Sequence, residues 1–371
     1  MTRMRVLVCT VVHHPADARI YHRQIRALLE AGHQVTYIAP VDSVTSFPER
    51  SSPGLQVIAV PRAVGRRRVG ALLAARKALA RHAAGADLVL IHDPELLLVL
   101  PPRRRRPPTV WDVHEDTVAA LSTKPWLPRP LRPAAALATR AAEHGAERRV
   151  HLILAEQGYL PRFRRPHPVV PNTTYVPDTV PPPAPPGQDQ RVVYVGHLSP
   201  DRGVGEMIEL AGLLRPHGIA VELIGPADAR ARSLIEPAQA KGLIRWAGFV
   251  PNDQAMPMVD GALAGLSLLQ DEPNFRHSLP TKVVEYMARG VPVVTTPLPA
   301  AAELATRHEC GFVVPFGDPR AAADAVLELA GDASLRAKMG SNGHEAARRS
   351  LGWPADARAF VAQLEAWAGT G

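Results

Sequence analysis

The chain has 371 residues, more than one hydrophobic core usually organises, and this length predicts two domains. With 46% hydrophobic and 21% charged residues it has the composition of an ordinary soluble globular protein, and no apolar run reaches the ~18 residues of a membrane-spanning helix. Two cysteines, Cys9 and Cys310, are too few for a disulfide framework and favour a reducing compartment. We therefore expect a cytoplasmic protein.

The net charge of +8 comes from 43 basic residues, most of them arginine. The runs GRRRVG at 65–70 and PPRRRRPP at 101–108 leave three interpretations open: solvated loops, contact with an anionic membrane surface, or nucleic-acid binding. Neither run contains an aromatic residue that could stack on a base. We expect no nucleic-acid partner, and peripheral contact with the inner face of a membrane stays open.

Strand-like apolar runs alternate with helical stretches in both halves of the chain. The first half offers MRVLVCTV (4–11), a helix over 17–32, QVTYIAP (34–40), DLVLIHD (87–93), PTVWDVH (108–114) and HLILAE (151–156). The second half offers RVVYVG (191–196), IAVELIG (219–225), LIRWAGFV (243–250), LAGLSLLQ (263–270) and VPVVTT (291–296). Continuous apolar strands of this kind are typical of parallel sheets covered on both faces.

A proline-rich segment, 176–190, separates the two halves and disfavours both helix and ladder strand. We expect an α/β protein with two doubly wound Rossmann-like domains facing across a cleft: 1–175, a linker over 176–190, and 191–352. A last helix over 353–371 should pack back toward the first domain. Ligands of such domains bind at the carboxyl ends of the strands, so the loops after the strands carry the candidate site.

Two of these loops in the second half have features of an anion site. In YVGHLSPDRGV, Arg202 precedes the glycine-bounded start of a helix, where backbone amides and a guanidinium can hold a phosphate; a solvated Arg202 is the alternative. In SLPTKVVEYMARG, Lys282 stands in the first turn of a helix, where the helix dipole disfavours a cation unless an anion binds. Glu285 lies on the same face, as a sugar-hydroxyl acceptor or merely as the partner of Lys282.

Histidines gather at the predicted strand ends of the first half: His13, His92 and His114. His92-Asp93 and His114-Glu115 are residues that can ligate metals, but H-E-x-x-H, C-x-x-C and D-x-D motifs are absent from the sequence. We expect no metal and no other cofactor. The sequence also lacks a G-x-G-x-x-G fingerprint and a P-loop, which disfavours nicotinamide chemistry and P-loop phosphoryl transfer.

Taken in order and spacing, HPADARI, HDPELLL, WDVHED, YVGHLSPDRGV, SLPTKVVEYMARGVPVVTT and CGFVVPFGDP resemble the retaining glycosyltransferases of family four, which have the GT-B fold. The resemblance covers nearly the whole chain. It implies that a hexosyl or N-acetylhexosaminyl group moves from a nucleotide diphosphate-sugar, for example a UDP-sugar, to an acceptor hydroxyl, with retention and without a metal. The acceptor would be a small molecule, a glycan or a lipid-linked glycan, bound by the first domain.

The resemblance also implies roles for individual residues. Arg202 and Lys282 match the positions that hold the donor diphosphate, Glu285 the ribose-binding glutamate, and His114 the histidine that faces the donor sugar; we take His114, Arg202 and Lys282 as catalytic. The donor site would consist of Gly196, Arg202, Gly203, Phe249, Asn274, His277, Lys282 and Glu285. The acceptor side would consist of His13, Asp17, Arg19, His92, Asp93 and Glu115.

The sequence departs from the common family pattern in two places. Where many relatives have a pair of glutamates eight residues apart, the first position is His277, so the chain resembles a subgroup with a Pro-x-Lys turn, Pro280 to Lys282. Gly196 is followed by His197 instead of the usual arginine. A nucleotide-sugar epimerase on the same fold and a non-catalytic nucleotide-sugar-binding protein remain alternatives.

Overall fold

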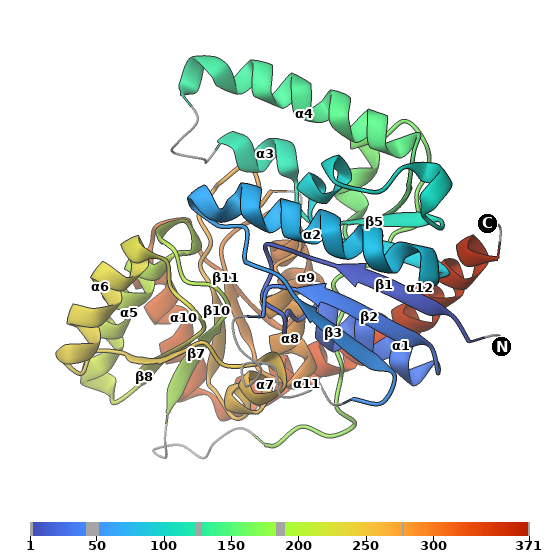
Figure 1. Ribbon diagram of the computed structural model, residues 1–371. Coiled ribbons are helices and arrows are strands. Elements are labelled where there is room, and N and C mark those ends of the chain that lie inside the picture. The colour runs from blue at the N-terminus through green and yellow to red at the C-terminus, as the bar shows by residue number, and fades with distance from the viewer. Residues whose placement is uncertain (1–2, 42–51, 123–127, 183–189, 277, 370–371) are drawn as a thin grey trace. The chain divides into compact units, whose positions relative to one another are not determined.

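The computed structural model describes residues 3–41, 52–122, 128–182, 190–276 and 278–369. Internal contacts divide the chain into unit 1, Met1–Asn172 with Pro354–Gly371, and unit 2, Thr173–Trp353 (Figure 1). The predicted linker starts inside unit 2, because the Pro177 carbonyl lies 2.8 Å from His344 Nε2 of that unit. Residues 183–189 of the predicted linker lie outside the described residues.

Unit 1 is built on a parallel sheet of six strands in the order β3-β2-β1-β4-β5-β6. Its strands are β1 (Arg5–Cys9), β2 (Gln34–Ala39), β3 (Leu55–Ala59), β4 (Leu88–Ile91), β5 (Thr109–Val113) and β6 (His151–Leu154). Its α-helices are α1 (Arg26–Glu30), α2 (Arg68–His82), α3 (Thr117–Ser122), α4 (Arg132–Glu147) and α12 (Trp353–Ala368). Short helical turns are η1 (Ile20–Ile25), η3 (Gly65–Arg67), η4 (Ala83–Gly85), η5 (Pro94–Leu98), η6 (Arg103–Arg105), η7 (Arg129–Leu131) and η8 (Gln157–Arg162).

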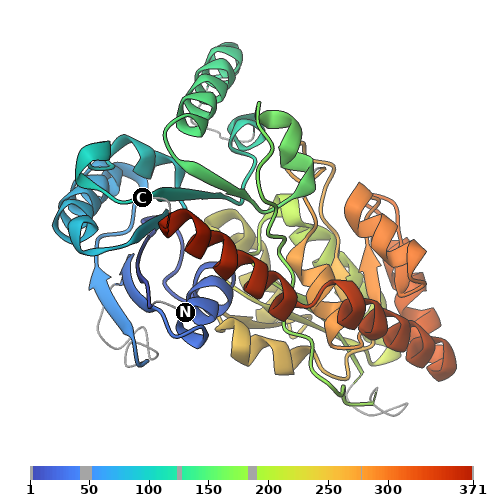
Figure 2. The same ribbon diagram turned by 90° about the vertical axis from the view of Figure 1, so that its right-hand side faces the viewer.

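The terminal helix α12 belongs to unit 1, and Figure 2 shows it in dark red beside the blue start of the chain. Phe360 and Leu364 of this helix are fully buried. On its polar side, the Glu365 carboxylate lies 3.2 Å from His33 Nε2, and the Trp367 ring stacks on His151 with centroids 4.6 Å apart. The helix is therefore part of the core that stabilises unit 1.

Unit 2 repeats the same sheet, with β12-β11-β10-β7-β8-β9 in space and all neighbours parallel. Its strands are β7 (Arg191–Val195), β8 (Ala220–Ile224), β9 (Arg245–Gly248), β10 (Ala264–Ser267), β11 (Val293–Thr295) and β12 (Gly311–Val313). Its helices are α5 (Val204–Leu214), α6 (Ala229–Ala240), α7 (Asn252–Val259), α8 (Thr281–Ala288), α9 (Pro299–Arg307), α10 (Pro319–Gly331) and α11 (Ala333–Ser350), with the short turns η9 (Pro200–Arg202) and η10 (Arg215–His217).

The sheet of unit 2 has a core on both faces, as the continuous apolar strands predict. In β7, Val192 and Tyr194 enter one cluster, while Val193 and Val195 enter the other. Successive side chains of a strand point to opposite faces, so both faces must be apolar when helices cover both. In both units the strand order reverses in the middle, at β1/β4 and at β7/β10, and this is where a doubly wound sheet leaves a crevice for ligands.

Candidate active site

In unit 1 the carboxylate of Asp112 is the centre of a buried polar network. Asp112 lies in β5 and is fully buried, and the Arg19 guanidinium donates to both of its oxygens, from Nε at 2.7 Å and from a terminal nitrogen at 2.6 Å. Gln24 Nε2 donates to the same carboxylate at 3.1 Å. Arg19 and Gln24 are five residues apart. Because a π-helix pairs residues at this spacing, the turn η1 places both side chains on the same face, toward Asp112.

The charge of this network is balanced within the protein. Burial on its own would raise the pKa of Asp112, but the adjacent Arg19 outweighs it and holds the pKa well below its usual range. Arg19 is only 5% exposed, and its second terminal nitrogen donates to Asn172 Oδ1 at 2.9 Å. The guanidinium thus joins η1, β5 and the segment at Asn172, and the acceptor-side role expected for Arg19 stays a prediction.

Asp93, which follows β4, has a similar positioning role. Its Oδ2 accepts hydrogen bonds from Thr10 Oγ1 at 2.9 Å and from the Val11 amide at 2.5 Å, so it shapes the loop that leaves β1. Its other oxygen lies 3.3 Å from His13 Nε2. Because Asp93 is 1% exposed, its carboxylate acts on His13 and the loop and is not offered to solvent.

His13 and His114 face each other at the crevice of the first sheet, with their Nε2 atoms 3.0 Å apart. His114 Nδ1 lies 3.0 Å from the Asp112 carbonyl oxygen, an acceptor, so Nδ1 carries the hydrogen and Nε2 of His114 holds a lone pair. The hydrogen between the rings then belongs to His13. The other nitrogen of His13, Nδ1, lies 3.8 Å from Asp17 Oδ2.

The electrostatics agree with this assignment of hydrogens. Burial lowers the pKa of His114, and the neighbouring His13 lowers it further, so His114 is the neutral member. Burial would also lower the pKa of His13, but Asp17, Asp93 and Glu115 together outweigh it and raise that pKa. Asp17 is fixed in turn by the amides of Arg19 and Ile20, which donate to its Oδ1 at 2.9 and 3.0 Å. The pair is thus a proton donor and a proton acceptor held in contact.

Among the described residues of unit 1, two sets of side chains have ligand atoms close enough to be considered for a metal, all within 4.8 Å of one another: His13, His114 and Glu115; and His92, Asp112 and His114. In the second set, Asp112 is already engaged by the Arg19 guanidinium, which a cation would have to displace. In the first set, the facing imidazole nitrogens share a hydrogen, and the Glu115 side chain is exposed. Neither donor set has the closed arrangement of a structural metal site.

In unit 2 the ammonium group of Lys282 is buried at the β7/β10 crevice. Lys282 is 5% exposed, and its Nζ lies 4.9 Å from the centroid of the Tyr194 ring. Gly196 follows β7 with φ of +131°, a backbone conformation that favours glycine, and a Cβ placed there would be in ordinary van der Waals contact with Lys282 Cε, at 3.5 Å. Burial, and next Arg202, lower the pKa of Lys282 to about 7, while Glu285 acts in the opposite direction.

Arg202 approaches the same tyrosine from η9. Its guanidinium lies 5.5 Å from the Phe275 centroid; burial raises the pKa of Tyr194, and Arg202 opposes that rise. Gly203 follows with φ of +81°, and a Cβ there would lie 2.1 Å from the Leu268 carbonyl oxygen, so only glycine fits at this start of α5. Two cations and the amino end of α5 therefore meet beside Tyr194, an arrangement that suits a diphosphate.

Glu285, one turn after Lys282, is 4% exposed and accepts a hydrogen bond from Asn252 Nδ2 at 3.1 Å. This burial excludes the alternative of a solvated Lys–Glu pair on an exposed helix. Sequence reasoning missed Asn252, although it starts α7 in the GFVPND loop at a predicted strand end. It also missed Tyr286, whose hydroxyl accepts from the Val195 amide at 2.9 Å and donates to the Leu266 carbonyl at 3.1 Å.

The remaining predicted donor-site residues differ in their surroundings. Asn274 Oδ1 is buried without a hydrogen-bond partner among the described residues, so this oxygen has capacity for one more contact. The Phe249 side chain is 46% exposed. His277 lies outside the described residues.

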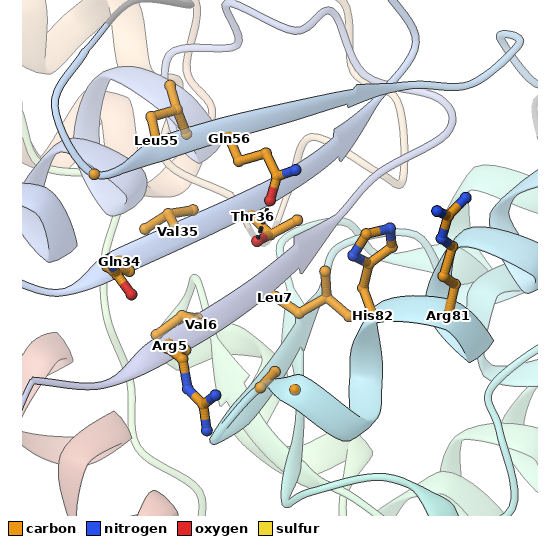
Figure 3. Close-up of a pocket in the computed structure, with 13 residues that line it drawn as sticks. Arg5, Val6, Leu7, Gln34, Val35, Thr36, Leu55, Gln56, Arg81 and His82 are labelled. Atoms are coloured by element: carbon orange, nitrogen blue, oxygen red, sulfur yellow. Dashed lines mark hydrogen bonds between the residues drawn. The ribbon is translucent and has the colours of Figure 1, made fainter.

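A groove of about 430 Å³ opens elsewhere in unit 1, at the amino ends of β1, β2 and β3 (Figure 3). Polar side chains of Gln34, Thr36, Gln56, Arg81 and His82 line it, and Thr36 Oγ1 lies 3.5 Å from Gln56 Oε1. The predicted site residues follow the carboxyl ends of the strands, so this groove is a separate feature and contains none of them.

Comparison with known proteins assigns both halves of the chain. The model of the glycosyl transferase 4-like domain matches residues 18–187, and the model of glycosyl transferases group 1 matches residues 178–346. The chain belongs to the GT4 family of glycosyltransferases with the GT-B fold. Within this GT4 chain, Arg202, Lys282 and Glu285 lie in the group 1 match, and His92 and His114 lie in the 4-like match.

Named relatives match part of this GT4 chain. WcaL of Salmonella typhimurium, named for colanic acid biosynthesis, is 30% identical over 149 residues, 39% of this chain and 37% of its own length. The amylovoran biosynthesis glycosyltransferase AmsK of Erwinia amylovora is 28% identical over 147 residues, 38% of this chain and 36% of AmsK. The matches thus span little more than a third of these relatives.

Solved structures match over the whole length and support the fold. A sucrose-phosphate synthase of Thermosynechococcus elongatus superposes with a TM-score of 0.75 at 19% identity, covering 100% of both chains. Anabaena Alr3699/HepE, solved in complex with UDP and glucose, gives a TM-score of 0.72 at 17% identity, covering 98% of this chain and 100% of HepE. The two-domain α/β architecture expected from the sequence is confirmed.

Proposed function

We propose that the protein transfers a sugar from a nucleotide diphosphate-sugar to an acceptor hydroxyl, with retention at the anomeric carbon and without a metal. The observation that carries this proposal is the cation pair of unit 2, which consists of the buried Lys282 and the partly buried Arg202. Lys282 and Arg202 meet beside Tyr194 at the strand-order reversal, and burial together with Arg202 lowers the pKa of Lys282 to about 7. A bound diphosphate would supply the negative charge that this pair lacks.

In the proposed reaction, the bond between the anomeric carbon and the diphosphate oxygen breaks, and a bond to the acceptor oxygen forms. The acceptor proton passes to the departing diphosphate oxygen on the same face, so the configuration is retained. Lys282, Arg202 and the amino end of α5 stabilise the charge that develops on the diphosphate. This charge stabilisation is the task for which a metal is used in other enzymes, and the cation pair takes its place.

The other residues serve binding and orientation in this scheme. Glu285, held by Asn252, accepts hydrogen bonds from the ribose hydroxyls. Neutral His114, held through Nδ1 by the Asp112 carbonyl, accepts at Nε2 from a sugar hydroxyl that displaces the His13 N–H, its present partner. The relatives are named for the biosynthesis of colanic acid, amylovoran and a capsular polysaccharide, and we accordingly propose a glycan as the acceptor.

Steady-state kinetics of Lys282→Ala and Arg202→Ala test the proposal. Since a charge-assisted contact to the developing diphosphate contributes about 2–4 kcal/mol to the transition state, each substitution should lower kcat/KM by about 10²-fold or more. The exposed Arg276→Ala in the same loop region serves as the control and should leave kcat/KM within about twofold, because its partner is the exposed Asp271.

Product analysis separates the alternatives. Incubation with donor alone should leave the sugar unchanged; an epimerised donor would identify the protein as an epimerase instead. Transfer that survives dialysis against a chelator supports the metal-free scheme, and loss of transfer that Mg²⁺ or Mn²⁺ restores would contradict it. The anomeric configuration of the product, read by NMR, decides retention.

A further inference from the structure

Helix α2 of unit 1 has an exposed face that combines apolar and cationic side chains. Ala71, Ala75 and Leu79 are buried, so the side of the helix that carries them faces the core. On the outward side, Val69 is 69% exposed and Leu73 is 58% exposed, although both are large apolar side chains. At 100° per residue, Arg76 and Lys77 fall on the same outward side as these two residues.

The same stretch carries one sign of charge. Between residues 51 and 86 the sequence contains seven basic residues and no aspartate or glutamate. These basic residues are all exposed: Arg62, Arg66, Arg67, Arg68, Arg76, Lys77 and Arg81. Arg68 lies 3.5 Å from Glu95, which belongs to η5. We call the set Arg66, Val69, Leu73, Arg76 and Lys77 the α2 face.

Two more large apolar side chains of unit 1 are exposed, one in the segment before α2 and one in η5. Val64, which precedes η3, is 59% exposed. Leu98, at the end of η5 and three residues after the Arg68 partner Glu95, is 84% exposed. Single exposed apolar residues are common on proteins, but a group of them among cations is not expected on a surface that meets only water.

The chemistry of the α2 face favours one occupant. Arginine and lysine bind lipid phosphate groups at about 1 kcal/mol each, and valine and leucine side chains can enter the boundary between headgroups and acyl chains. Nucleic acid would use the cations but has no use for exposed valine and leucine, and residues 51–86 contain no phenylalanine, tyrosine or tryptophan to stack on bases.

We propose that η3 and the α2 face bind the surface of an anionic lipid bilayer. The helix lies on the bilayer and does not cross it: among the described residues, no helix is long and apolar enough to span a membrane. This inference goes beyond the proposed sugar transfer and does not depend on it, because the α2 face contains no residue of the donor or histidine sites.

Co-sedimentation with large vesicles tests the inference. The full chain should bind vesicles of phosphatidylglycerol and phosphatidylcholine in equal parts, and bind at least tenfold more weakly to vesicles of phosphatidylcholine alone. Raising the salt concentration about fivefold from 0.1 M should weaken binding, because the Debye length falls. Equal binding to both vesicle types, or no binding to either at about 0.1 M salt, would overturn the inference.

Two double variants separate the contributions of charge and apolar surface. Arg66→Ser with Lys77→Ser, and Val69→Ser with Leu73→Ser, should each lower the vesicle partition coefficient about tenfold. The matched control is Arg230→Ser with Leu234→Ser on α6, where the leucine is 44% exposed and the arginine stands four residues before it. If the control loses as much binding as either α2 variant, the α2 face is not the binding surface.

A competing nucleic-acid function is an outcome of the same series. A DNA duplex of about 30 base pairs, at the same low salt concentration, should not compete with the vesicles. If the duplex displaces them and binds the Val69/Leu73 variant as well as the unmodified chain, the face is a phosphate-binding surface for nucleic acid, and the lipid proposal fails. Unchanged thermal unfolding of all variants shows that loss of binding is not loss of folding, as exposed positions allow.

Discussion

At the residue scale, the most informative group is the Lys282 ammonium. It is buried, and the negative charge of Glu285 offsets only part of the effect of burial and of Arg202 on its pKa. The pKa of Lys282 is about 7, far below the 10.5 of an ordinary lysine. The unliganded fold therefore binds the ammonium proton of Lys282 more weakly than the unfolded chain does. The unliganded protein should therefore gain stability as the pH rises from about 7 toward 10.5. Burial disfavours the charged form of Lys282, and a bound anion favours it. An anion bound next to Lys282 should therefore interact strongly with the ammonium group.

We predict that the affinity for a UDP-sugar falls as the pH rises above about 7. The bound anion raises the pKa of Lys282, so binding takes up a proton wherever the free lysine is neutral, and Kd should rise by up to about tenfold per pH unit between about 7 and 9. A UDP-sugar has no terminal phosphate group that titrates in this range. Calorimetry in buffers of different ionisation enthalpy measures the proton uptake directly.

The control for this prediction is Lys282→Arg, since a guanidinium remains charged across the range. Whatever its overall affinity, the variant should have a Kd that is flat across the same pH range, and its proton uptake should vanish. A flat Kd in the unmodified protein would show that Lys282 is already protonated or does not contact the donor.

The residues that sequence reasoning found and missed differ in how they act. Lys282 and Glu285 could be found because a lysine in the first turn of a helix conflicts with the helix dipole, and such a local conflict is visible in sequence. Asp112 and Asn252 act through Arg19 and Glu285, which are distant in sequence. A partner 93 or 33 positions away cannot be read from spacing, although a charged residue inside the apolar run TVWDV was a signal for Asp112.

At the element scale, α8 holds both Lys282 and Glu285, and Tyr286 fixes this helix on the sheet. The Tyr286 hydroxyl bridges β7 and β10 at the point where the strand order reverses. A Cβ on Gly265 would lie 2.3 Å from the Tyr286 ring, so that glycine makes room for the ring on β10. The tyrosine thus sets where the first turn of α8, with its lysine, lies over the crevice.

We predict that Tyr286→Phe destabilises the protein by about 1–3 kcal/mol, because the buried Val195 amide loses its acceptor. Loosening of α8 should also weaken UDP-sugar binding, by roughly 3- to 30-fold. Denaturant unfolding and calorimetric titration measure the two effects. Tyr175→Phe, with a side chain that is 41% exposed, is the control and should change stability by less than about 0.5 kcal/mol. Unchanged donor affinity in a destabilised Tyr286→Phe would mean that the anchor serves stability alone.

The elements that could be predicted from sequence are mostly the central ones. The strand runs that we expected correspond to β1, β2 and β4 to β11, and most of these strands are buried along their length. Two edge strands, β3 and β12, were not among them: β3 is partly exposed along its length and carries Gln56, and β12 has three partly buried residues. An edge strand has one neighbour, so it needs neither the length nor the apolar character that makes a central strand recognisable.

At the scale of the whole molecule, the two units have the same strand order but carry different side chains at the reversal of that order. In unit 1 the reversal carries a pair of histidines flanked by carboxylates, and in unit 2 it carries two cations. The same fold thus presents a pair of histidines that share a hydrogen in one half and two cations in the other. The difference lies in the loops after the strands, as expected when function is grafted on a common scaffold.

We predict that Phe360→Ala in α12 destabilises unit 1 by about 3–5 kcal/mol, because a fully buried ring leaves a cavity. Hydrogen exchange should accelerate for the amides of β1 and β2. Arg358→Ala on the exposed side of the same helix should leave exchange in these strands unchanged. Slow exchange in β1 and β2 of Phe360→Ala would contradict the place of α12 in the core of unit 1.

The discontinuity of unit 1 affects the order in which the protein matures on the ribosome. Unit 2 is one continuous stretch, Thr173–Trp353, and all of it has been synthesised before the residues that complete unit 1 leave the exit tunnel. Domains generally fold as units while they emerge. The first unit to be translated is therefore the last to become complete, and nascent chains should expose the apolar surface that Phe360 and Leu364 cover until α12 has left the exit tunnel.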